Sequence, residues 1–345
     1  MHRRALIAAL LLAVAACGPR DGREAFTDSR VPPSVAPRFY PPEGWAWGLV
    51  KVGSAPAQRY GVAAPPVAPK ANLLILTGYD DPAETWFETV ADLTRRGYAV
   101  WVLDRAGQGG SARLTGRRDL GHAKRFDPDV AAVRAMVRVV IRPNGKTPTI
   151  LVGHSLGGLI ALRAVQSGLG ADGLVLSAPA IELANLPQPR GQVAAWTRWA
   201  RRLGLGAFRT PGQPGWRPEG RDGPFGQLTH DPTRAAMHRA WAEANPDLRM
   251  GGSSLAWFAA FYDASDAAQA AAARTAPPTL LLTASDDSLA DNAASQRLCT
   301  TLPACSETAI ANAWHDLPRE ADPARDAWLS ALDGFVRQRT AAAAR

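Results

Sequence analysis

Apolar runs and amphipathic segments of helical length alternate through most of the chain. Five apolar runs suit strands buried on both faces of a sheet. They are residues 72–77, 98–104, 149–153, 173–177 and 279–283, and the helices predicted between and after them are 82–96, 127–141, 156–166, 291–302 and 323–339. Residues 46–52 and 58–63 predict a first hairpin, and a last strand is expected near 307–311. This alternation predicts an α/β fold with a mostly parallel, doubly wound sheet.

The alternation breaks between residues 182 and 274. This stretch is rich in proline, glycine, arginine and tryptophan, and it contains helical segments but no obvious buried strand. A long insertion between two sheet strands has the position of a lid. We therefore expect an α/β core in two parts, residues 41–181 and 275–345, with a helical lid over residues 182–274 between them.

One helix of the insertion separates apolar from basic side chains. At helical spacing it carries Val193, Trp196, Trp199 and Leu203, while on another side it carries Arg198, Arg201 and Arg202. Tryptophan together with arginine suits a lipid–water interface. The spacing taken alone favours the other interpretation, a helix that packs on the core through its apolar side and exposes a basic face to solvent.

The N-terminus has the pattern of an export signal. A positively charged start precedes an apolar run that is too short to be expected to span a membrane, and residues 1–16 are interpreted as a signal peptide. Small residues directly before Cys17 resemble the lipobox of bacterial lipoproteins, whose cysteine becomes lipidated; the alternative is an ordinary signal with an incidental cysteine. We expect a lipid-anchored protein on the periplasmic side of the bacterial cell envelope, and Gly18 favours the outer membrane.

The composition of the chain indicates a flexible tether, a net positive charge and two cysteines that could pair. Residues 17–40 are rich in Pro, Arg, Asp and Ser and are predicted to be a flexible tether. Without the signal peptide the chain holds 37 basic and 31 acidic side chains, which favours anionic membrane surfaces, and nothing resembles a nucleic-acid-binding module. Cys299 and Cys305 could form a disulfide in an oxidising compartment, but a zinc site is not expected.

Ser155 lies between two glycines at the end of an apolar run and before a helix-forming segment. This pattern is typical of a nucleophile elbow, in which a sharp strand-to-helix turn exposes the serine hydroxyl. The turn strains the backbone and leaves no room for a side chain at Gly153 or Gly157. The pattern therefore predicts acyl transfer through Ser155.

A serine nucleophile needs a base and an acid that orients the base. Among the six histidines only His315 follows the last predicted strand, where this architecture places the base. The loop after the strand at 279–283 offers three carboxylates, and position favours Asp286 or Asp287. Asp291 is better suited to cap the helix that follows it.

The charge that develops on the substrate oxygen needs two hydrogen-bond donors. One expected donor is the backbone N–H of Leu156, directly after the nucleophile and at a helix N-terminus. The other is the backbone N–H of Tyr79, in the loop after the strand that ends at Thr77. Gly78 in this loop lets the backbone come close to a substrate.

Several motifs resemble one branch of the α/β-hydrolases, that of the monoacylglycerol lipases and bacterial lysophospholipases, which are serine-aminopeptidase-like hydrolases. The shared motifs are GHSLGG at 153–158 and LDRAGQGGS at 103–111. A more specific likeness to the bacterial lysophospholipases lies in GHAKRF at 121–126, LTHD at 228–231 and NPDLRMGG at 245–252. The family often has His-Gly at the oxyanion loop, where this chain has Thr77-Gly78.

The resemblance implies an α/β-hydrolase with Asp287 as the acid and His315 as the base. It also implies hydrolysis of a lipid ester, with a lysophospholipid or a monoacylglycerol as substrate and no metal or organic cofactor. An acyltransferase that uses the same acyl-enzyme is the first alternative, and an aminopeptidase is a weaker one because the lid offers few acids to hold an amine. A lipid-binding lipoprotein on a disabled hydrolase fold is the non-catalytic alternative.

Overall fold

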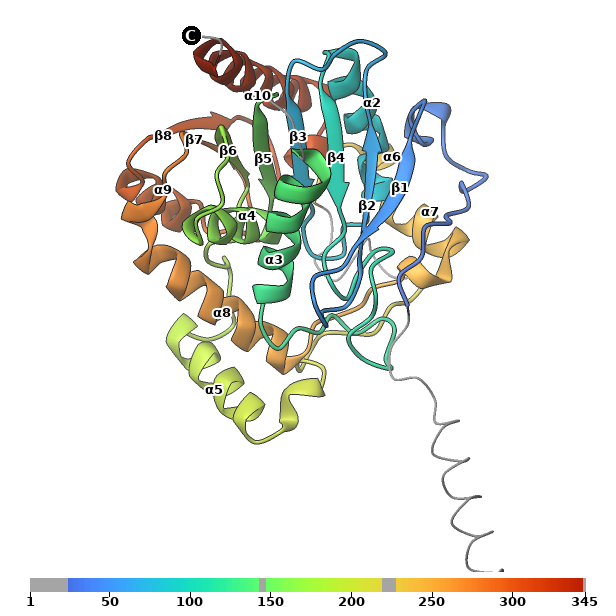
Figure 1. Ribbon diagram of the computed structural model, residues 1–345. Coiled ribbons are helices and arrows are strands. Elements are labelled where there is room, and N and C mark those ends of the chain that lie inside the picture. The colour runs from blue at the N-terminus through green and yellow to red at the C-terminus, as the bar shows by residue number, and fades with distance from the viewer. Residues whose placement is uncertain (1–23, 143–146, 219–227, 344–345) are drawn as a thin grey trace, which may run out of the picture.

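The computed structural model describes residues 24–142, 147–218 and 228–343 and contains one eight-stranded sheet (Figure 1). The strand order is β1-β2-β4-β3-β5-β6-β7-β8. The strands are β1 (Ala46–Val50), β2 (Gln58–Ala63), β3 (Asn72–Leu76), β4 (Ala99–Leu103), β5 (Thr149–His154), β6 (Gly173–Ser177), β7 (Thr279–Ala284) and β8 (Cys305–Ile310). Strand β2 pairs antiparallel with β1 and β4 and all other pairs are parallel, so the predicted hairpin and mostly parallel sheet are confirmed.

Helices cover both faces of this sheet. The helices are α2 (Phe87–Arg95), α3 (Asp127–Ala135), α4 (Leu156–Gln166), α5 (Arg190–Arg202), α6 (Pro232–Ala235), α7 (Met237–Ala244), α8 (Leu255–Ala270), α9 (Asn292–Thr301) and α10 (Asp322–Ala343). Every residue of β3 is buried, and because successive side chains of a strand point to opposite faces, two apolar layers are needed. Leu74 and Leu76 pack with α3, α4 and α8, whereas Leu73 and Ile75 pack with α2 and α10.

The insertion between β6 and β7 contributes to the buried core of the protein. Helix α8 is largely buried, and Trp257, Phe261 and Tyr262 belong to the same apolar core as α3 and α4. Helix α5 packs along α8, while α7 lies on the opposite side of the molecule (Figure 1), where Trp241 packs on Phe87. Among the described residues, no helix combines the length and the apolar character needed to cross a bilayer.

The predicted flexible tether is wrong for residues 24–40, which pack against the folded body. Val35 and Phe39 are buried in a small apolar cluster with Trp241. The backbone of Arg30 exchanges two hydrogen bonds with the Asn245 side chain, at 2.7 and 2.9 Å. The prediction rested on the polar and proline-rich composition of this segment. Its few apolar side chains pack against residues that are distant in the sequence, and only the tertiary structure shows these contacts. The signal peptide and Cys17 lie outside the described residues.

The spacing of α5 favoured an apolar side against the core and a basic face in solvent, and the structure shows the reverse orientation. Arg198 donates to Asp263 on α8 at 2.7 Å, and Arg201 donates to the other carboxylate oxygen of Asp263 at 2.7 Å. Trp196 and Trp199 are exposed instead. The helix therefore meets α8 with ion pairs and presents aromatic side chains to solvent, because the acidic residues of α8 supply partners that the sequence of α5 cannot reveal.

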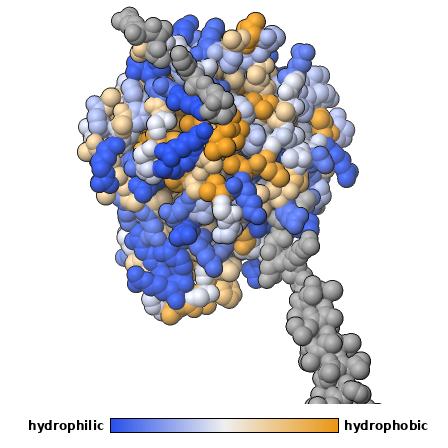
Figure 2. Space-filling model, in the orientation of Figure 1, coloured by the Kyte–Doolittle hydropathy of each residue, from blue (hydrophilic) through white to orange (hydrophobic). Residues whose placement is uncertain are grey.

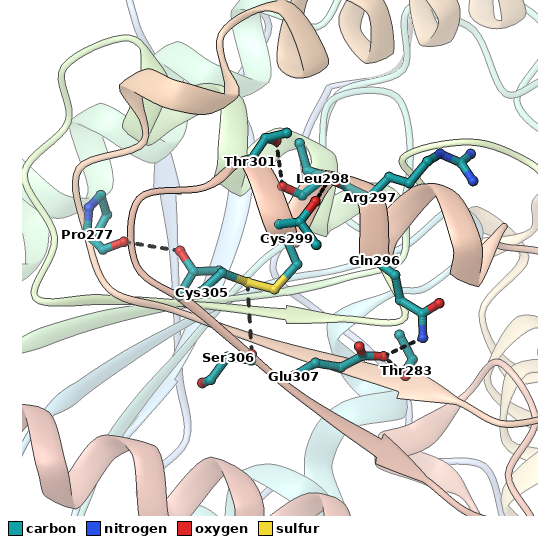
Figure 3. Close-up of a disulfide and its surroundings, with 12 residues drawn as sticks. Pro277, Thr283, Gln296, Arg297, Leu298, Cys299, Thr301, Cys305, Ser306 and Glu307 are labelled. Carbon is teal, nitrogen blue, oxygen red and sulfur yellow. Dashed lines mark hydrogen bonds between the residues drawn. A yellow bond between two sulfur atoms is a disulfide. The ribbon is translucent and has the colours of Figure 1, made fainter.

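The expected disulfide between Cys299 and Cys305 is present (Figure 3). It joins the end of α9 to the first residue of β8, across a sequence separation of 6 residues. Strand β8 is the edge strand of the sheet and pairs only with β7. The disulfide therefore fastens the outermost strand to the helix that precedes it.

Replacing Cys299 and Cys305 together by alanine is expected to lower the free energy of unfolding by about 2 kcal/mol, since a disulfide that closes a short loop removes little entropy from the unfolded chain. Urea unfolding of the oxidised protein and of the double variant measures the difference. Dithiothreitol should lower the unfolding midpoint of the original protein and leave that of the variant in place. Equal midpoints for the oxidised protein and the variant would contradict the assignment.

Candidate active site

Ser155 stands at the turn between β5 and α4 in a strained backbone conformation. Its φ of 52° and ψ of −123° lie in a region that side chains other than glycine rarely adopt. A Cβ added at Gly157 would lie 1.9 Å from the carbonyl oxygen of Leu76, and one at Gly153 would lie 2.5 Å from the Cα of Gly158. Both glycines are therefore needed for the strand and helix to pack this closely, as the elbow pattern predicts.

The last two strands of the sheet bring an acid and a base to this serine. The loop after β7 carries Asp287 and the loop after β8 carries His315, and a backbone hydrogen bond of 3.0 Å from Asp286 to Ala313 ties the two loops together. His315 Nε2 lies 2.9 Å from Ser155 Oγ. His315 Nδ1 lies 2.8 Å from one carboxylate oxygen of Asp287 and 3.0 Å from the other.

The contact with Asp287 fixes where the proton on the imidazole lies. A carboxylate only accepts hydrogen bonds, so Nδ1 of His315 carries the hydrogen and Nε2 is left as the acceptor for the Ser155 hydroxyl. The His315 side chain is buried, so water competes little for either bond. The arrangement can therefore take a proton from Ser155 and stabilise the imidazolium that results.

Asp287, and not Asp286, is the carboxylate that contacts His315. Burial by itself raises the pKa of Asp287, but His315 and the backbone N–H groups of Leu289 and Ala290 lower it by more, and the net pKa lies below its usual value. Asp286 is exposed and accepts a bond from the Ser285 hydroxyl. Asp291 accepts from the backbone N–H of Ala294 and caps α9, as predicted.

The loop after β3 passes directly over the nucleophile. Leu76 on β3 is paired with Gly153 on β5, so the residues that follow the two strands emerge side by side. A Cβ added at Gly78 would lie 3.2 Å from Ser155 Cβ. Leu156 is the first residue of α4, where a helix leaves its N–H groups without internal acceptors. This placement suits the predicted donors, the backbone N–H groups of Tyr79 and Leu156.

The segments that resemble lysophospholipase motifs meet the loops of this site. The side chain of Tyr79 donates to the carbonyl oxygen of Gly251 at 2.8 Å and packs edge-on against Trp257. The backbone N–H of Asp316 donates to Leu228 at 2.9 Å. The ring of His230 packs on that of Trp314, which precedes His315, with 3.9 Å between ring centroids and a tilt of 31° between the planes. The insertion therefore holds both the oxyanion loop and the loop of His315.

Sequence reasoning missed the buried carboxylate that organises the loop of the base. Glu320 accepts the backbone N–H of Trp314 at 2.8 Å and contacts His230 Nδ1 at 2.7 Å. It also accepts the backbone N–H groups of His230 and Ala321, at 3.1 and 2.6 Å. Its partners come from two segments about 90 residues apart in sequence, so no local pattern could have revealed it.

A family model described as "Serine aminopeptidase, S33" (Hydrolase_4) matches residues 67–322, which include Ser155, Asp287 and His315. This chain belongs to that family. The hydrolase is 28% identical to lysophospholipase L2 of Escherichia coli K12 over 275 residues, which cover 76% of this chain and 79% of that protein. It is 23% identical to a probable lysophospholipase L2 of Haemophilus influenzae over 273 residues, 79% of this chain and 85% of that one.

Solved structures place the hydrolase in the α/β-hydrolase fold. A soluble variant of monoglyceride lipase from Saccharomyces cerevisiae, in complex with a substrate analogue, superimposes with a TM-score of 0.65 at 16% identity, covering 86% of this chain and 96% of that one. A carboxyl esterase from Bacillus coagulans, in complex with glycerol, gives a TM-score of 0.68 at 15% identity, covering 86% and 99%. The predicted fold class is thus confirmed.

Proposed function

We propose that this hydrolase cleaves the carboxylic ester of a lysophospholipid or of a monoacylglycerol through an acyl-enzyme on Ser155. The observation that carries the proposal is the hydrogen-bonded series Ser155, His315 and Asp287 beneath the loop of Gly78. The two lysophospholipase L2 relatives support a lysophospholipid substrate, because they match most of the chain.

Acylation begins with proton transfer. His315 Nε2 accepts the hydroxyl proton as Ser155 Oγ forms a bond to the ester carbonyl carbon, and Asp287 stabilises the imidazolium. The backbone N–H groups of Tyr79 and Leu156 donate to the oxyanion, which carries more charge than the ester carbonyl did. When the tetrahedral intermediate collapses, His315 returns the proton to the departing alcohol oxygen.

Deacylation repeats the sequence with water. His315 removes a proton from a water molecule, whose oxygen attacks the acyl carbon, and collapse of the second intermediate breaks the bond to Ser155 Oγ and returns the proton to it. The products are a fatty acid and glycerol or a glycerophosphodiester. No step needs a metal or an organic cofactor.

We propose that the hydrolase is located in the bacterial envelope, on the periplasmic side and preferably at the outer membrane, and that lipidated Cys17 anchors it. The lipobox-like residues before Cys17 support the anchor. The disulfide between Cys299 and Cys305 supports an oxidising compartment, since cytosolic thiols are kept reduced. Labelling of cells with a radioactive fatty acid tests it: the label should enter the protein and be absent from the Cys17→Ser variant.

A hydrolysis screen that compares lysophospholipids, monoacylglycerols and short acyl esters under identical conditions identifies the preferred substrate. We expect release of fatty acid to be fastest from the first two classes. Adding a lysophospholipid as acceptor and analysing the products separates hydrolysis from acyl transfer. Turnover of an aminoacyl arylamide in preference to all esters would contradict the proposal, as would the absence of turnover on every ester.

A further inference from the structure

Exposed apolar side chains gather on one short segment of the insertion. Five of the ten large apolar side chains that are exposed among the described residues lie between residues 196 and 208. They are 40 to 57% exposed and comprise Trp196, Trp199, Leu203, Leu205 and Phe208, which we call the aromatic face. The segment lies at the lower edge of the molecule in Figure 1, and Figure 2 shows apolar residues there beside strongly hydrophilic ones.

Ion pairs hold this face outward. Besides its bond to Asp263, Arg198 binds Asp266 on α8 at 2.6 Å, and Arg190 binds Glu182 at 2.9 Å. Turning α5 over to bury Trp196 and Trp199 would break these pairs and leave the carboxylates of α8 without their cations. The exposure of the two tryptophans therefore follows from the packing of α5 on α8.

Cations border the aromatic face. Arg202 is exposed on α5 directly before Leu203, and Arg201 donates to the carbonyl oxygen of Lys124, which brings the exposed Lys124 next to the same helix. Phe208 lines a surface pocket together with the exposed Arg117. Aromatic side chains surrounded by Lys and Arg match the boundary between the acyl chains and the anionic headgroups of a bilayer.

We infer that the aromatic face docks the hydrolase on the surface of an anionic phospholipid bilayer. A second copy of this chain is a poorer occupant, because face-to-face contact would bring the cations of both copies together. A bilayer supplies both apolar depth for the tryptophans and negative charge for the cations.

The docking face is connected to the oxyanion loop by a few residues. The backbone N–H of Leu255 donates to Phe208 at 2.9 Å, and Trp257, two residues later on α8, packs on Tyr79. A bilayer held at the aromatic face therefore lies against the part of the insertion that contacts the site. The purpose of docking rests on the proposed lipid substrate, but binding is measured without turnover, so the two proposals can fail separately.

The test is co-sedimentation with vesicles of phosphatidylcholine containing about one third phosphatidylglycerol. The chain beginning at Gly18 lacks the apolar leader and Cys17 but contains every residue that the structure describes. We expect it to bind, and we expect the triple variant Trp196→Ala, Trp199→Ala, Phe208→Ala to bind at least about tenfold more weakly. The matched control is Val67→Ser with Val139→Ser, two exposed apolar residues elsewhere, and it should bind like the parent.

Charge gives a second arm of the same experiment. Replacing Lys124 and Arg202 by glutamate should weaken binding to the anionic vesicles severalfold and have little effect on the weaker binding to pure phosphatidylcholine. Equal binding of the triple variant and its parent would overturn the inference. So would a concentration-dependent dimer that the triple variant abolishes, since the face would then belong to a second copy. Thermal unfolding of each variant verifies that it is folded.

Arg319 is a buried arginine behind the site. Its Nε lies 2.6 Å from Asp316 and its Nη1 lies 3.1 Å from Asp81. Burial lowers the pKa of Arg319, but Asp316 and Asp81 raise it by more, so the guanidinium stays charged. Each of the two carboxylates belongs to a different loop of the site.

Both carboxylates contact or adjoin residues next to the reacting groups. Asp81 accepts the backbone N–H of Gly78 at 3.0 Å and so holds the oxyanion loop, and it also accepts from the indole of Trp86. Asp316 directly follows the base, and its other oxygen faces Nε2 of His154 at 3.4 Å, one residue before the nucleophile. Arg319 thus joins the oxyanion loop to the loop of His315 across the back of the elbow.

The structure assigns Arg319 as a positioning residue that sets the oxyanion donors and the base relative to each other. It touches neither Ser155 nor His315, so its effect is on geometry and is felt in the transition state more than in substrate binding. Small misplacements of catalytic groups are enough to slow an enzyme strongly.

Arg319→Met is expected to lower kcat roughly 10- to 100-fold with KM within about threefold, and to slow labelling by a fluorophosphonate in parallel. Arg325→Met is the matched control, because Arg325 is equally buried and binds Asp92 and the carbonyl oxygen of Pro318 but does not contact Asp81. It should lose stability and keep kcat within about threefold.

Arg319→Lys keeps the charge without the forked geometry and should restore part of kcat. Equal losses of kcat in the Arg319 and Arg325 methionine variants would assign a merely structural role and overturn the inference. The same conclusion would follow if Arg319→Lys were stably folded and no more active than Arg319→Met.

Discussion

Ser155→Ala is expected to lower kcat for ester hydrolysis by roughly 10⁵- to 10⁶-fold, the scale on which serine hydrolases depend on their nucleophile. The only side-chain partner of Ser155 Oγ is His315 among the described residues. Removing the hydroxyl therefore takes away the covalent intermediate and leaves the elbow itself intact. The measurement is steady-state turnover of a p-nitrophenyl acyl ester, together with labelling by a fluorophosphonate, which should disappear.

Stability distinguishes this loss from misfolding. Because the variant alters neither Gly153 nor Gly157, the free energy of unfolding should change by less than about 1 kcal/mol. Turnover by the alanine variant within tenfold of the parent would refute Ser155 as the nucleophile. Retained fluorophosphonate labelling would do so as well, because that reagent forms its bond with an activated serine.

Asp287→Asn is expected to lower kcat by about 10⁴-fold with little change in KM. Asparagine keeps the size of the side chain and an oxygen that can accept from Leu289 and Ala290, but its amide can donate to His315 Nδ1. The imidazole then carries its hydrogen on Nε2 and cannot accept the proton of Ser155. Pre-steady-state measurement of the acylation burst locates the defect in the chemical step.

The neighbouring Asp286 provides the control. It is exposed, and Asp286→Asn should leave kcat within about twofold of the parent. If Asp286→Asn were the more damaging of the two substitutions, the assignment of the acid would be reversed. The pH dependence of unfolding gives a second check.

Because the pKa of Asp287 is lowered on folding, the stability it contributes is fully present above the pKa of an unfolded aspartate, near 4, and is lost as the pH falls through the lowered value. The free energy of unfolding of Asp287→Asn should therefore fall less steeply below about pH 4 than that of the parent. Equal slopes in urea unfolding between pH 4 and pH 2 would contradict the lowered pKa of Asp287.

The arginines of α5 show that the residue spacing of a helix does not by itself determine which side of the helix packs on the core. The separation of apolar and basic positions was correct as a pattern, but either side could face the core. The choice was made by Asp263 and Asp266 on α8, some 60 to 70 residues away in sequence. The small side chains Ala194, Thr197 and Ala200 form the buried side of α5, and its arginines pair with the acids of α8, so Trp196 and Trp199 are left exposed to solvent.

The sequence by itself determined the order of strands and helices, the elbow at Ser155 and the candidates for base and acid. These depend on local patterns: runs of buried residues, glycines where no side chain fits, and the position of a polar residue after a strand. Such patterns also placed Leu156 and Tyr79 near the nucleophile.

Only the tertiary structure decided which face of α5 is exposed and how residues 24–40 pack. It also revealed Arg319 and Glu320, which join segments far apart in sequence. Each of these outcomes depends on a partner from another part of the chain, and electrostatic or apolar contact energy exists only once folding has brought the two partners within reach.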